Sequence, residues 1–455
     1  MTSSARRPGL PPRILIVGGG YVGLYTALRA LRRFRSGEAV VTVVDPHSYM
    51  TYQPFLPEAA AGSIEARHVA VPLRRVLKGA EVISGHVTSL EHERGVAHVQ
   101  PLEGPAYELT YDHVVVAVGS ISRTLPIPGL AEQGTGFKTI EEAIQLRNQV
   151  IECMDIAQST RDEALRRRAL TFVVVGGGYS GIEVLGELED MSRYATRYYS
   201  RISPQDLSWH LVEASGRILP EVGEDMGRWT VEQLRERGIQ VHLQTKLESC
   251  VDGHVVLSDG TTMESETLVW TAGVKPNPFV GDTGFRLDDH GRLVGRSTLQ
   301  VEGHDDAWVA GDCSAIPDLG KPGEWYTPSA QHAVRQAKVL GDNLVAAVRG
   351  KPLGEYRHEY VGSVASLGLY KGVAQVYGVQ LKGFPAWFMH RTYHVSRVPT
   401  LTRKLNVVLD WTQALFFRRE IVSLWGMHEP FEQFQRAAGV LPARRPAPSD
   451  HDTTC

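Results

Sequence analysis

The stretch that decides the fold runs from Arg13 to Asp45 and reads RILIVGGGYVGLYTALRALRRFRSGEAVVTVVD. The residues after Arg13 are apolar and mostly β-branched, as in a buried parallel strand. Gly18, Gly20 and Gly23 follow in G-x-G-x-x-G spacing at the start of a helix. In this motif the first glycine permits a tight turn, the second lets a pyrophosphate approach, and the third lets the helix pack on the strand. Asp45 ends the next strand, where an acid can accept a hydrogen bond from a ribose hydroxyl. The stretch therefore predicts a β-α-β unit that binds a dinucleotide.

The same plan returns further along the chain. An apolar strand at 172–175 precedes Gly176, Gly178 and Gly181, which have the same spacing, and Glu213 ends the following strand. Glu213 comes thirty-two residues after Gly181, whereas about 20 is usual. We interpret the surplus as a helix extension and a loop. The second unit therefore predicts a second dinucleotide site.

Each unit is also followed by a buried strand that ends in a glycine. The first of these strands ends at Gly119, the second at Gly273, and a strand at 307–312 returns to the first unit. Repetition of a whole half-chain plan is stronger evidence than either glycine motif alone. We therefore predict an α/β fold with two interleaved Rossmann-like dinucleotide-binding domains.

The composition is that of an ordinary globular protein. A chain of 455 residues is long enough for two or three domains, and a net charge of −3 gives no reason to expect nucleic acid as a partner. The four cysteines lie far apart, which argues against a disulfide framework, a zinc site or a redox dithiol and fits a reducing, cytoplasmic setting. We find no signal-peptide pattern and no run of about 18 apolar residues, so we expect no membrane-spanning helix. From the cysteine spacing we also expect no bound metal.

The pattern also predicts domain boundaries. We expect one helical stretch of mixed charge from about Ile140 to Arg168, between the two dinucleotide domains. The chain divides into a flexible leader, a discontinuous first dinucleotide domain, a second dinucleotide domain, a C-terminal region and a disordered tail: 1–12; 13–135 with 286–354; 168–285; 355–440; and 441–455.

The segment from Lys382 to Arg419 differs in character from the rest of the chain. Its seven basic residues stand against the single acid Asp410, a net charge of +6, and seven aromatic residues lie between them. A helix after Pro399 would carry an apolar stripe on one face, formed by Leu401, Leu405, Val408, Thr412 and Leu415. This combination favours a C-terminal membrane-associating region that lies in the bilayer interface. The alternative is an ordinary helix packed on the body or on a second subunit.

Taken in order, these segments resemble the two-dinucleotide-fold flavoproteins, and within them the type II NADH dehydrogenases. These are single-chain NADH:quinone oxidoreductases that pump no protons. The resemblance covers about residues 13–425 and implies FAD on the first glycine motif and NADH, as substrate, on the second. It further implies a membrane quinone as electron acceptor and a peripheral position on the cytoplasmic face of the cell membrane. The oligomeric state is left open, a homodimer included.

By this resemblance, particular residues hold the two nucleotides. The FAD set has Gly18, Gly20, Gly23 and Asp45 at the ADP half, Val87 near the adenine, Asp312 at the ribityl chain, and Gly119 and Ala330. The NADH set is Gly176, Gly178, Gly181, Glu213 and Gly273. Glu213 should repel a 2′-phosphate, which favours NADH over NADPH, although Arg217 lies close by in the sequence. The alternative role of Asp312 is that of a helix N-cap.

Two residues are implied in catalysis. Glu183 is expected in the first turn of the second nucleotide helix, where an acid is also favoured by the helix dipole. The resemblance makes it a carboxylate near nicotinamide and flavin that assists proton movement. Gln331 belongs to the run AQHAVRQ at 330–336, which resembles the quinone-site motif AQxAxQQ, and would face the flavin and the quinone head group. Arg335 replaces the usual glutamine, which could alter quinone choice, and we interpret His332 as structural.

Three other functions stay open. A sulfide:quinone oxidoreductase needs cysteines beside its flavin, for which Cys153 and Cys313 are the only plausible pair. A soluble NADH-dependent reductase of a ferredoxin-like protein would have no use for the basic aromatic segment. A nucleotide-sensing redox protein would turn over slowly. If the C-terminal segment serves only for docking, a chain that ends near Gly378 should still bind FAD and reduce a water-soluble acceptor.

Overall fold

The computed structural model describes residues 10–358, 362–417, 419–424 and 432–439. Most of the predicted leader and all of the predicted tail, 441–455, lie outside the described residues, as do Arg418 and Cys455.

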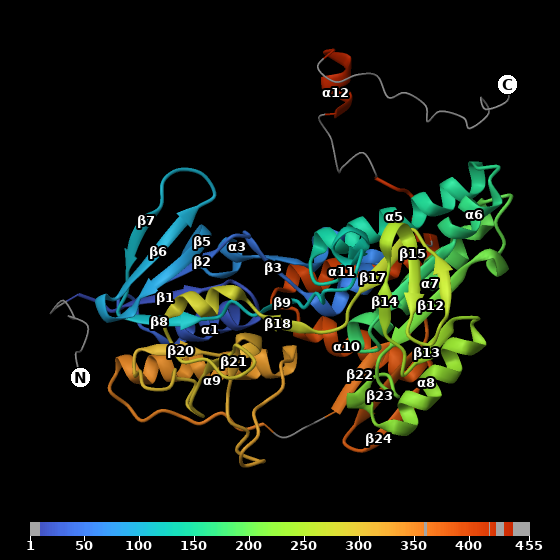
Figure 1. The fold of residues 1–455 in the computed structure, drawn as a ribbon. Coiled ribbons are helices and arrows are strands. Elements are labelled where there is room, and N and C mark those ends of the chain that lie inside the picture. Colours follow the sequence, from blue (N-terminus) through green and yellow to red (C-terminus); the bar gives the residue numbers. More distant parts are fainter. Residues whose placement is uncertain (1–9, 359–361, 418, 425–431, 440–455) are drawn as a thin grey trace.

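Two sheets, one in each half of the molecule, form its framework (Figure 1). The first sheet has seven strands: β20 (Ala307–Val309), β8 (His113–Val116), β1 (Arg13–Val17), β2 (Val40–Asp45), β5 (Glu81–Glu91), β6 (Val96–Pro101) and β7 (Tyr107–Thr110), in that spatial order. The strands from β20 to β5 run parallel, and β5, β6 and β7 continue as an antiparallel meander. The strands β1 and β8 are almost wholly buried, as their apolar sequences predict.

The second sheet repeats the parallel arrangement. Its five strands are β10 (Gly134–Thr135), β17 (Thr267–Trp270), β11 (Thr171–Val175), β12 (Ser208–Glu213) and β13 (Gln240–Leu243). An antiparallel hairpin system, β14 (Leu247–Ser249), β15 (His254–Leu257) and β16 (Thr262–Glu264), adjoins it in sequence. The predicted α/β fold with a repeated half-chain plan is therefore confirmed.

Helices follow the strands in the expected order. Their bounds are α1 (Tyr21–Arg33), α2 (Leu56–Ala60), α3 (Leu73–Val76), α4 (Leu130–Gln133), α5 (Ile140–Ser159), α6 (Glu163–Ala169), α7 (Tyr179–Ala195), α8 (Glu224–Glu236) and α9 (Ala330–Val348). The helices α1 and α9 pack side by side although some 300 residues separate them, and β20 pairs with β8. The chain after 300 therefore returns to the first sheet, as predicted.

Short two-stranded ladders pair segments of the chain that lie outside the two main sheets. The strand β9 (Ser120–Ser122) pairs with β18 (Val274–Pro276), where the two connections between the sheets cross. The other ladders are β3 (Tyr49–Thr51) with β4 (Ala70–Pro72), and β19 (Leu293–Val294) with β21 (Ser314–Ala315). The strand β10 pairs with β17, so Gly134 and Thr135 join the second sheet rather than the first.

The helical stretch expected from about Ile140 to Arg168 is confirmed in its extent, but it consists of two helices, α5 and α6, with a break between Ser159 and Glu163. Asp162 is the N-cap of α6 and accepts hydrogen bonds from the N–H groups of Ala164 and Leu165. An aspartate favours this capping role over a helix interior, and it restarts the helix in a new direction.

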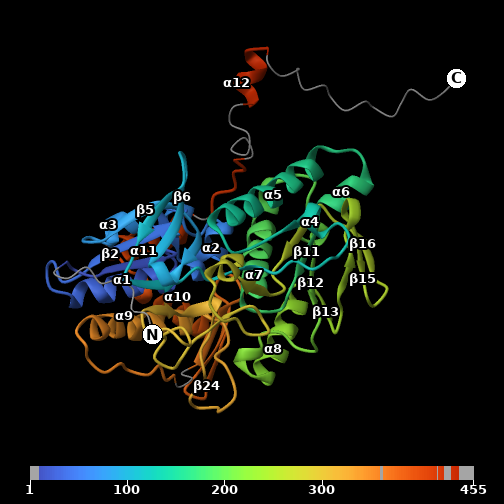
Figure 2. The same cartoon turned by 60° about the vertical axis from the view of Figure 1, so that its left-hand side comes forward.

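The C-terminal region consists of a small sheet and two helices. The sheet has β22 (Gly362–Ser366), β23 (Gly372–Val376) and β24 (Val379–Lys382), and the helices are α10 (Phe384–Arg397) and α11 (Leu401–Phe417). A short α12 (Glu432–Ala437) lies away from the rest of the described chain in both views (Figures 1 and 2). No helix within the described ranges is sufficiently long and apolar to cross a bilayer.

Candidate functional site

A pocket of about 370 Å³ opens at the carboxyl ends of β1, β2 and β8. Carboxyl ends of parallel strands are where open α/β sheets bind their ligands. Seven of the eight residues that the sequence assigns to FAD line this pocket: Gly18, Gly20, Asp45, Val87, Gly119, Asp312 and Ala330.

The three glycines of the first motif differ in what surrounds them. Gly18 has a φ of +103°, and a Cβ there would lie 2.5 Å from the carbonyl oxygen of Ala117. A Cβ on Gly23 would lie 1.8 Å from the oxygen of Gly18, so this glycine is needed for packing and does not line the pocket. A Cβ on Gly20 would meet nothing within 4 Å. Open space therefore lies next to Gly20 at the start of α1, where the free N–H groups of a helix favour a phosphate.

The Asp45 carboxylate is fixed at the tip of β2. It accepts hydrogen bonds from the N–H of Gly19 at 2.6 Å and from the N–H of His47 at 2.7 Å. A carboxylate has further acceptor positions, so Asp45 can also bind the hydroxyls of a ribose. The position agrees with the role predicted for it.

A polar network that the sequence did not reveal lies across the pocket. The Ser120 hydroxyl donates to Asp312 Oδ2 at 2.7 Å, and Lys138 Nζ donates to the Ser120 carbonyl and hydroxyl oxygens at 2.8 and 2.7 Å. Burial lowers the pKa of Lys138, an effect that the nearby Asp312 and Glu142 oppose. Asp312 lies within the turn 311–313 and caps no helix with its side chain, so its remaining acceptor positions can bind the hydroxyls of a polyol.

The second glycine motif repeats the geometry of the first. Gly176 has a φ of +116°, a Cβ on Gly181 would lie 1.9 Å from the Gly176 oxygen, and a Cβ on Gly178 would meet nothing within 4 Å. Glu213 ends β12 and accepts from the N–H groups of Gly177 at 2.6 Å and Ser215 at 2.7 Å. Gly273 also faces open space and has a φ of +99°. The two halves of the chain thus present the same backbone cradle and the same fixed carboxylate.

Glu183 lies on α7, the helix that begins at the second cradle. It is the fifth residue of α7, so its expected place in the first turn is wrong. The residue is buried, and its Oε1 accepts from the N–H of Ser366 at 3.0 Å and lies 3.0 Å from Nε2 of the buried His390. Glu183 therefore joins the second nucleotide unit to β22 and α10. Its part in proton movement stays a prediction.

Gln331 faces the C-terminal region, while its neighbour Ala330 lines the pocket. Gln331 Nε2 donates to the oxygen of Gly362 at 3.2 Å, and Arg335 Nη1 donates to Gln331 Oε1 at 3.1 Å. Arg335, which replaces a glutamine of the motif, thus holds the side-chain amide of Gln331 in place. His332 Nδ1 lies 2.8 Å from the hydroxyl of Tyr356, and burial lowers its pKa to about 4, so it remains neutral. This contact suits the structural role assigned to His332.

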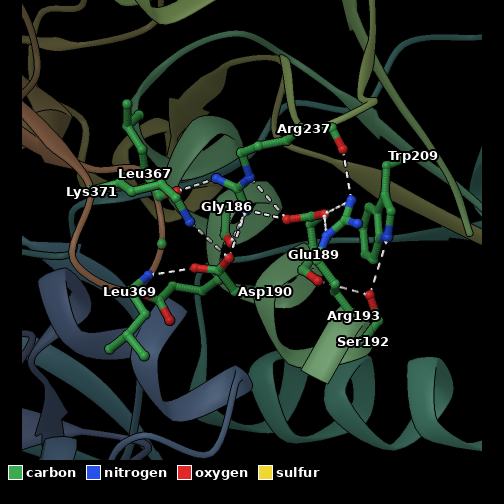
Figure 3. Close-up of polar contacts among 12 residues, drawn as sticks. Gly186, Glu189, Asp190, Ser192, Arg193, Trp209, Arg237, Leu367, Leu369 and Lys371 are labelled. Carbon is green, nitrogen blue, oxygen red and sulfur yellow. Dashed lines mark hydrogen bonds and ion pairs between the residues drawn. The ribbon is translucent and has the colours of Figure 1, made fainter. Parts of the chain in front are cut away.

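Acidic side chains of α7 clamp the C-terminal region to the second unit (Figure 3). Arg237 bonds both Glu189 and Asp190, and it also contacts the Leu367 carbonyl. Asp190 in turn accepts from the N–H of Leu369 at 2.5 Å and from Lys371 Nζ at 3.2 Å. These bonds hold the turn between β22 and β23 against α7.

Two basic residues of the predicted membrane segment point inward instead. Arg391 Nη2 lies 2.7 Å from Oε2 of the buried Glu58, and Arg419 Nη2 lies 2.6 Å from Oε2 of the buried Glu187. Two of the seven basic residues are therefore engaged inside the protein. A chain that ends near Gly378 would leave both acids buried without a cation, which is strongly destabilising. The expectation that such a truncated chain keeps its activity is therefore withdrawn.

The apolar face predicted for the helix after Pro399 is exposed. Its large apolar members Leu401, Leu405, Val408 and Leu415 are between 43% and 71% exposed. Leu409, Phe416 and Phe417, which the prediction did not include, are also exposed on α11. The opposite face holds α11 on the body, because Asp410 Oδ2 lies 2.5 Å from His68 Nδ1 and Val407 is fully buried. An exposed apolar patch of this kind marks an interaction surface.

Cys153 and Cys313 do not form a reactive pair. Cys153 in α5 contacts Thr267, whereas Cys313 contacts the carbonyl oxygens of Val116 and Ala310. Both thiols are buried and free, and burial raises their pKa, to about 11 for Cys153 and about 12 for Cys313. A thiol that stays protonated is a poor nucleophile.

Known proteins share this arrangement over most of the chain. The family model of the pyridine nucleotide-disulphide oxidoreductases matches residues 12–337. A probable NADH dehydrogenase of Dictyostelium discoideum is 29% identical over 423 residues, which cover 90% of this chain and 91% of that protein. A type II NADH:quinone oxidoreductase of Mycobacterium tuberculosis is 27% identical over 420 residues, covering 88% of each.

The solved structure of NDH2 from Plasmodium falciparum in complex with NADH has the same fold. It superposes with a TM-score of 0.83 over 90% of this chain and 99% of that one, at 17% sequence identity. The chain belongs to the pyridine nucleotide-disulphide oxidoreductase family, and it groups there with the type II NADH:quinone oxidoreductases.

Proposed function

We propose that this protein oxidises NADH and passes the electrons, by way of a bound FAD, to a quinone in the membrane on whose cytoplasmic surface it lies, without pumping protons. The observation that carries the proposal is the pair of matching dinucleotide cradles, one of which opens into the lined pocket. The curated relatives named above support the reaction.

The residues of the first pocket fit FAD. Gly20 and the start of α1 would hold the pyrophosphate, Asp45 the adenosine ribose, and Asp312 the ribityl hydroxyls. Lys138 supplies a cation beside Asp312 that would favour negative charge on the cofactor. Bound FAD would supply two-electron chemistry that can accept a hydride and pass electrons to a quinone.

The second cradle would bind NADH, with Glu213 at the adenosine ribose. Glu213→Gln should narrow the preference for NADH over NADPH in kcat/KM by about tenfold, or about 1.4 kcal/mol, because it removes the charge that repels a 2′-phosphate. Steady-state kinetics with both nucleotides measure this. Asp45→Asn, the matched change in the first cradle, should leave the NADH/NADPH ratio unaltered. A wild-type enzyme that uses NADPH as well as NADH would contradict the role of Glu213.

Gln331 would act on the quinone side. Gln331→Ala should slow flavin reoxidation by quinone about tenfold while the rate of reduction by NADH stays within about twofold, because the Gln331 amide bonds Gly362 and Arg335 and belongs to the helix assigned to the quinone side. Stopped-flow traces of the two half-reactions provide the measurement. Lys338→Ala, an exposed change on the same helix, is the control. Equal slowing of both half-reactions would mean that Gln331 acts on the flavin environment as a whole.

The exposed apolar face of α11 would bring the enzyme to its lipid-soluble acceptor. The exposed Arg397 at the end of α10 and the half-buried Lys404 on α11 lie in the same region and would attract anionic head groups. A second copy of the chain could cover the same face, so a dimer is the competing use of this surface.

A spectroscopic titration tests the proposal as a whole. The purified protein should be yellow, NADH should bleach its flavin absorbance, and a short-chain quinone should restore it. Sulfide should not bleach it, because the buried Cys153 and Cys313 thiols stay protonated. Bleaching by sulfide would favour a sulfide:quinone oxidoreductase, and a protein without flavin would refute the proposal.

A further inference from the structure

Three potential metal ligands meet at the end of the first sheet that faces away from the dinucleotide pocket. His92 begins the turn between β5 and β6, Asp306 directly precedes β20, and His304 lies two residues before Asp306. One ligand atom of each lies within 4.8 Å of the others. The pocket lies at the carboxyl end of β8, whereas this cluster adjoins the amino end of the same strand. There the Val114 N–H donates to the backbone carbonyl oxygen of Asp306 at 3.0 Å.

The geometry is close to that of a shared metal ion. His92 Nε2 and Asp306 Oδ1 are 3.0 Å apart. Two ligand atoms on one tetrahedral zinc, each bound at about 2.0–2.1 Å, lie about 3.3 Å apart. The imidazoles of His92 and His304 meet edge to face, with ring centroids 4.8 Å apart and an interplanar angle of 79°. A His304 ring nitrogen lies within 4.8 Å of both other ligand atoms, so the three side chains would have to draw closer to bind one ion.

The surroundings of the cluster resemble those that support metal ligands. The second ring nitrogen of His92, Nδ1, lies 3.2 Å from the hydroxyl of Tyr111, which is 2% exposed. Histidines that bind metals ordinarily hydrogen-bond through their other nitrogen in this way. The buried Phe285 packs against both imidazoles, with centroids 4.9 Å from each. Tyr111 thus orients the His92 ring, and Phe285 partly shields both imidazoles from water.

The charges also suit a divalent cation. The imidazoles of His92 and His304 can each offer one ring nitrogen, and Asp306 offers a negatively charged carboxylate oxygen. Two arginines near the cluster in sequence are paired with other acids: Arg296 with Asp305 at 3.0 Å, and Arg94 with Glu91 at 2.5 Å. Two imidazoles and one carboxylate are ligands that zinc accepts, and they leave a fourth position for water.

We propose that His92, His304 and Asp306 bind one zinc ion, which ties the β5–β6 turn to the entry of β20 across 214 residues of sequence. The ion would stabilise the folded first domain, since the unfolded chain does not bring these ligands together. The proposal is independent of the redox reaction. Without a metal, the same residues form only a hydrogen-bonded His–Asp pair with a neighbouring imidazole.

Equilibrium dialysis of the flavin-loaded protein tests the site. The protein is stripped with a chelator, dialysed against Zn²⁺, and analysed by elemental mass spectrometry. The variants are Asp306→Asn, which can still accept a hydrogen bond from His92 but loses the charge, and His304→Gln. The matched control is Asp305→Asn, which changes the adjacent acid that pairs with Arg296.

Wild type and Asp305→Asn should bind about one zinc per chain, and Asp306→Asn and His304→Gln should bind it at least tenfold more weakly. Zinc should raise the thermal midpoint of wild type and leave that of Asp306→Asn unchanged. Reduction of a water-soluble acceptor by NADH should be equal with and without zinc, which separates this site from the catalytic one. The proposal would be overturned if wild type bound no zinc. It would also be overturned if all variants bound the same amount, because the zinc would then be held by others of the 17 histidines.

Discussion

Arg391→Ala is expected to lower the free energy of unfolding by about 3–5 kcal/mol, since it removes the partner of a buried carboxylate. The guanidinium bonds Glu58 at 2.7 Å and stacks on Trp387 and Trp411, at 4.2 and 4.7 Å from their ring centroids. Trp411 Nε1 also donates to Glu58 Oε2, at 2.6 Å. Without Arg391, that indole would be the only side-chain partner left to Glu58 among the described residues, and part of the packing between the two tryptophans would be lost.

Chemical denaturation of the flavin-loaded protein, followed by tryptophan fluorescence, measures the effect. Arg397→Ala is the matched control, since Arg397 is an exposed arginine on the same helix, and it should cost no more than about 0.5 kcal/mol. The double variant Glu58→Gln/Arg391→Met should recover much of the loss, because no unpaired charge remains buried. If Arg391→Ala and Arg397→Ala lower the free energy of unfolding equally, the Arg391–Glu58 ion pair contributes nothing to stability and does not hold α10 in place.

Leu405→Glu/Leu409→Glu should weaken binding to anionic vesicles at least 100-fold and abolish activity with long-tailed quinones. Full burial of one leucine contributes about 1.5–3 kcal/mol, and each added carboxylate opposes an anionic surface by an amount on the order of 1 kcal/mol. The two leucines are 54% and 64% exposed, so the substitutions cost the folded protein little. NADH oxidation with a water-soluble acceptor should therefore remain.

Vesicle sedimentation at low and high salt measures this binding, with Leu102→Glu as the control. Leu102 is 63% exposed in the loop between β6 and β7, so it matches the change without touching α11. Wild-type binding should fall with salt as the basic residues are screened. A wild type that stays in the supernatant at both salt concentrations would refute the membrane assignment. A wild-type dimer that the double variant dissociates would assign the face to a second copy of the chain.

The contrast between Arg391 and Leu405 corrects the interpretation of the C-terminal segment. From sequence, all of its charges and aromatic rings count toward one amphipathic surface. In the structure, Arg391, Trp387 and Trp411 face Glu58, whereas Leu405 and its neighbours face outward. Helical periodicity separates an apolar face of a helix from a polar one. It does not tell which of the two faces will pack against a buried acid from a distant part of the chain.

The sequence by itself determined the two dinucleotide units. Gly18, Gly23 and Asp45 act within a few tens of residues, because a left-handed turn, a close helix–strand contact and an acid at a strand tip are all local requirements. The same holds for Gly176, Gly181 and Glu213. Such features can be predicted since the chain satisfies them with its own neighbouring residues.

Only the tertiary structure decided which distant side chains complete each site. Lys138 reaches Asp312 through Ser120, Glu183 meets His390, and His92 meets Asp306, all over long separations in sequence. Lysines, glutamates and histidines carry no local signal of their partners. Their contacts depend on how the sheets and α10 pack, and burial then makes each of these charges require a partner.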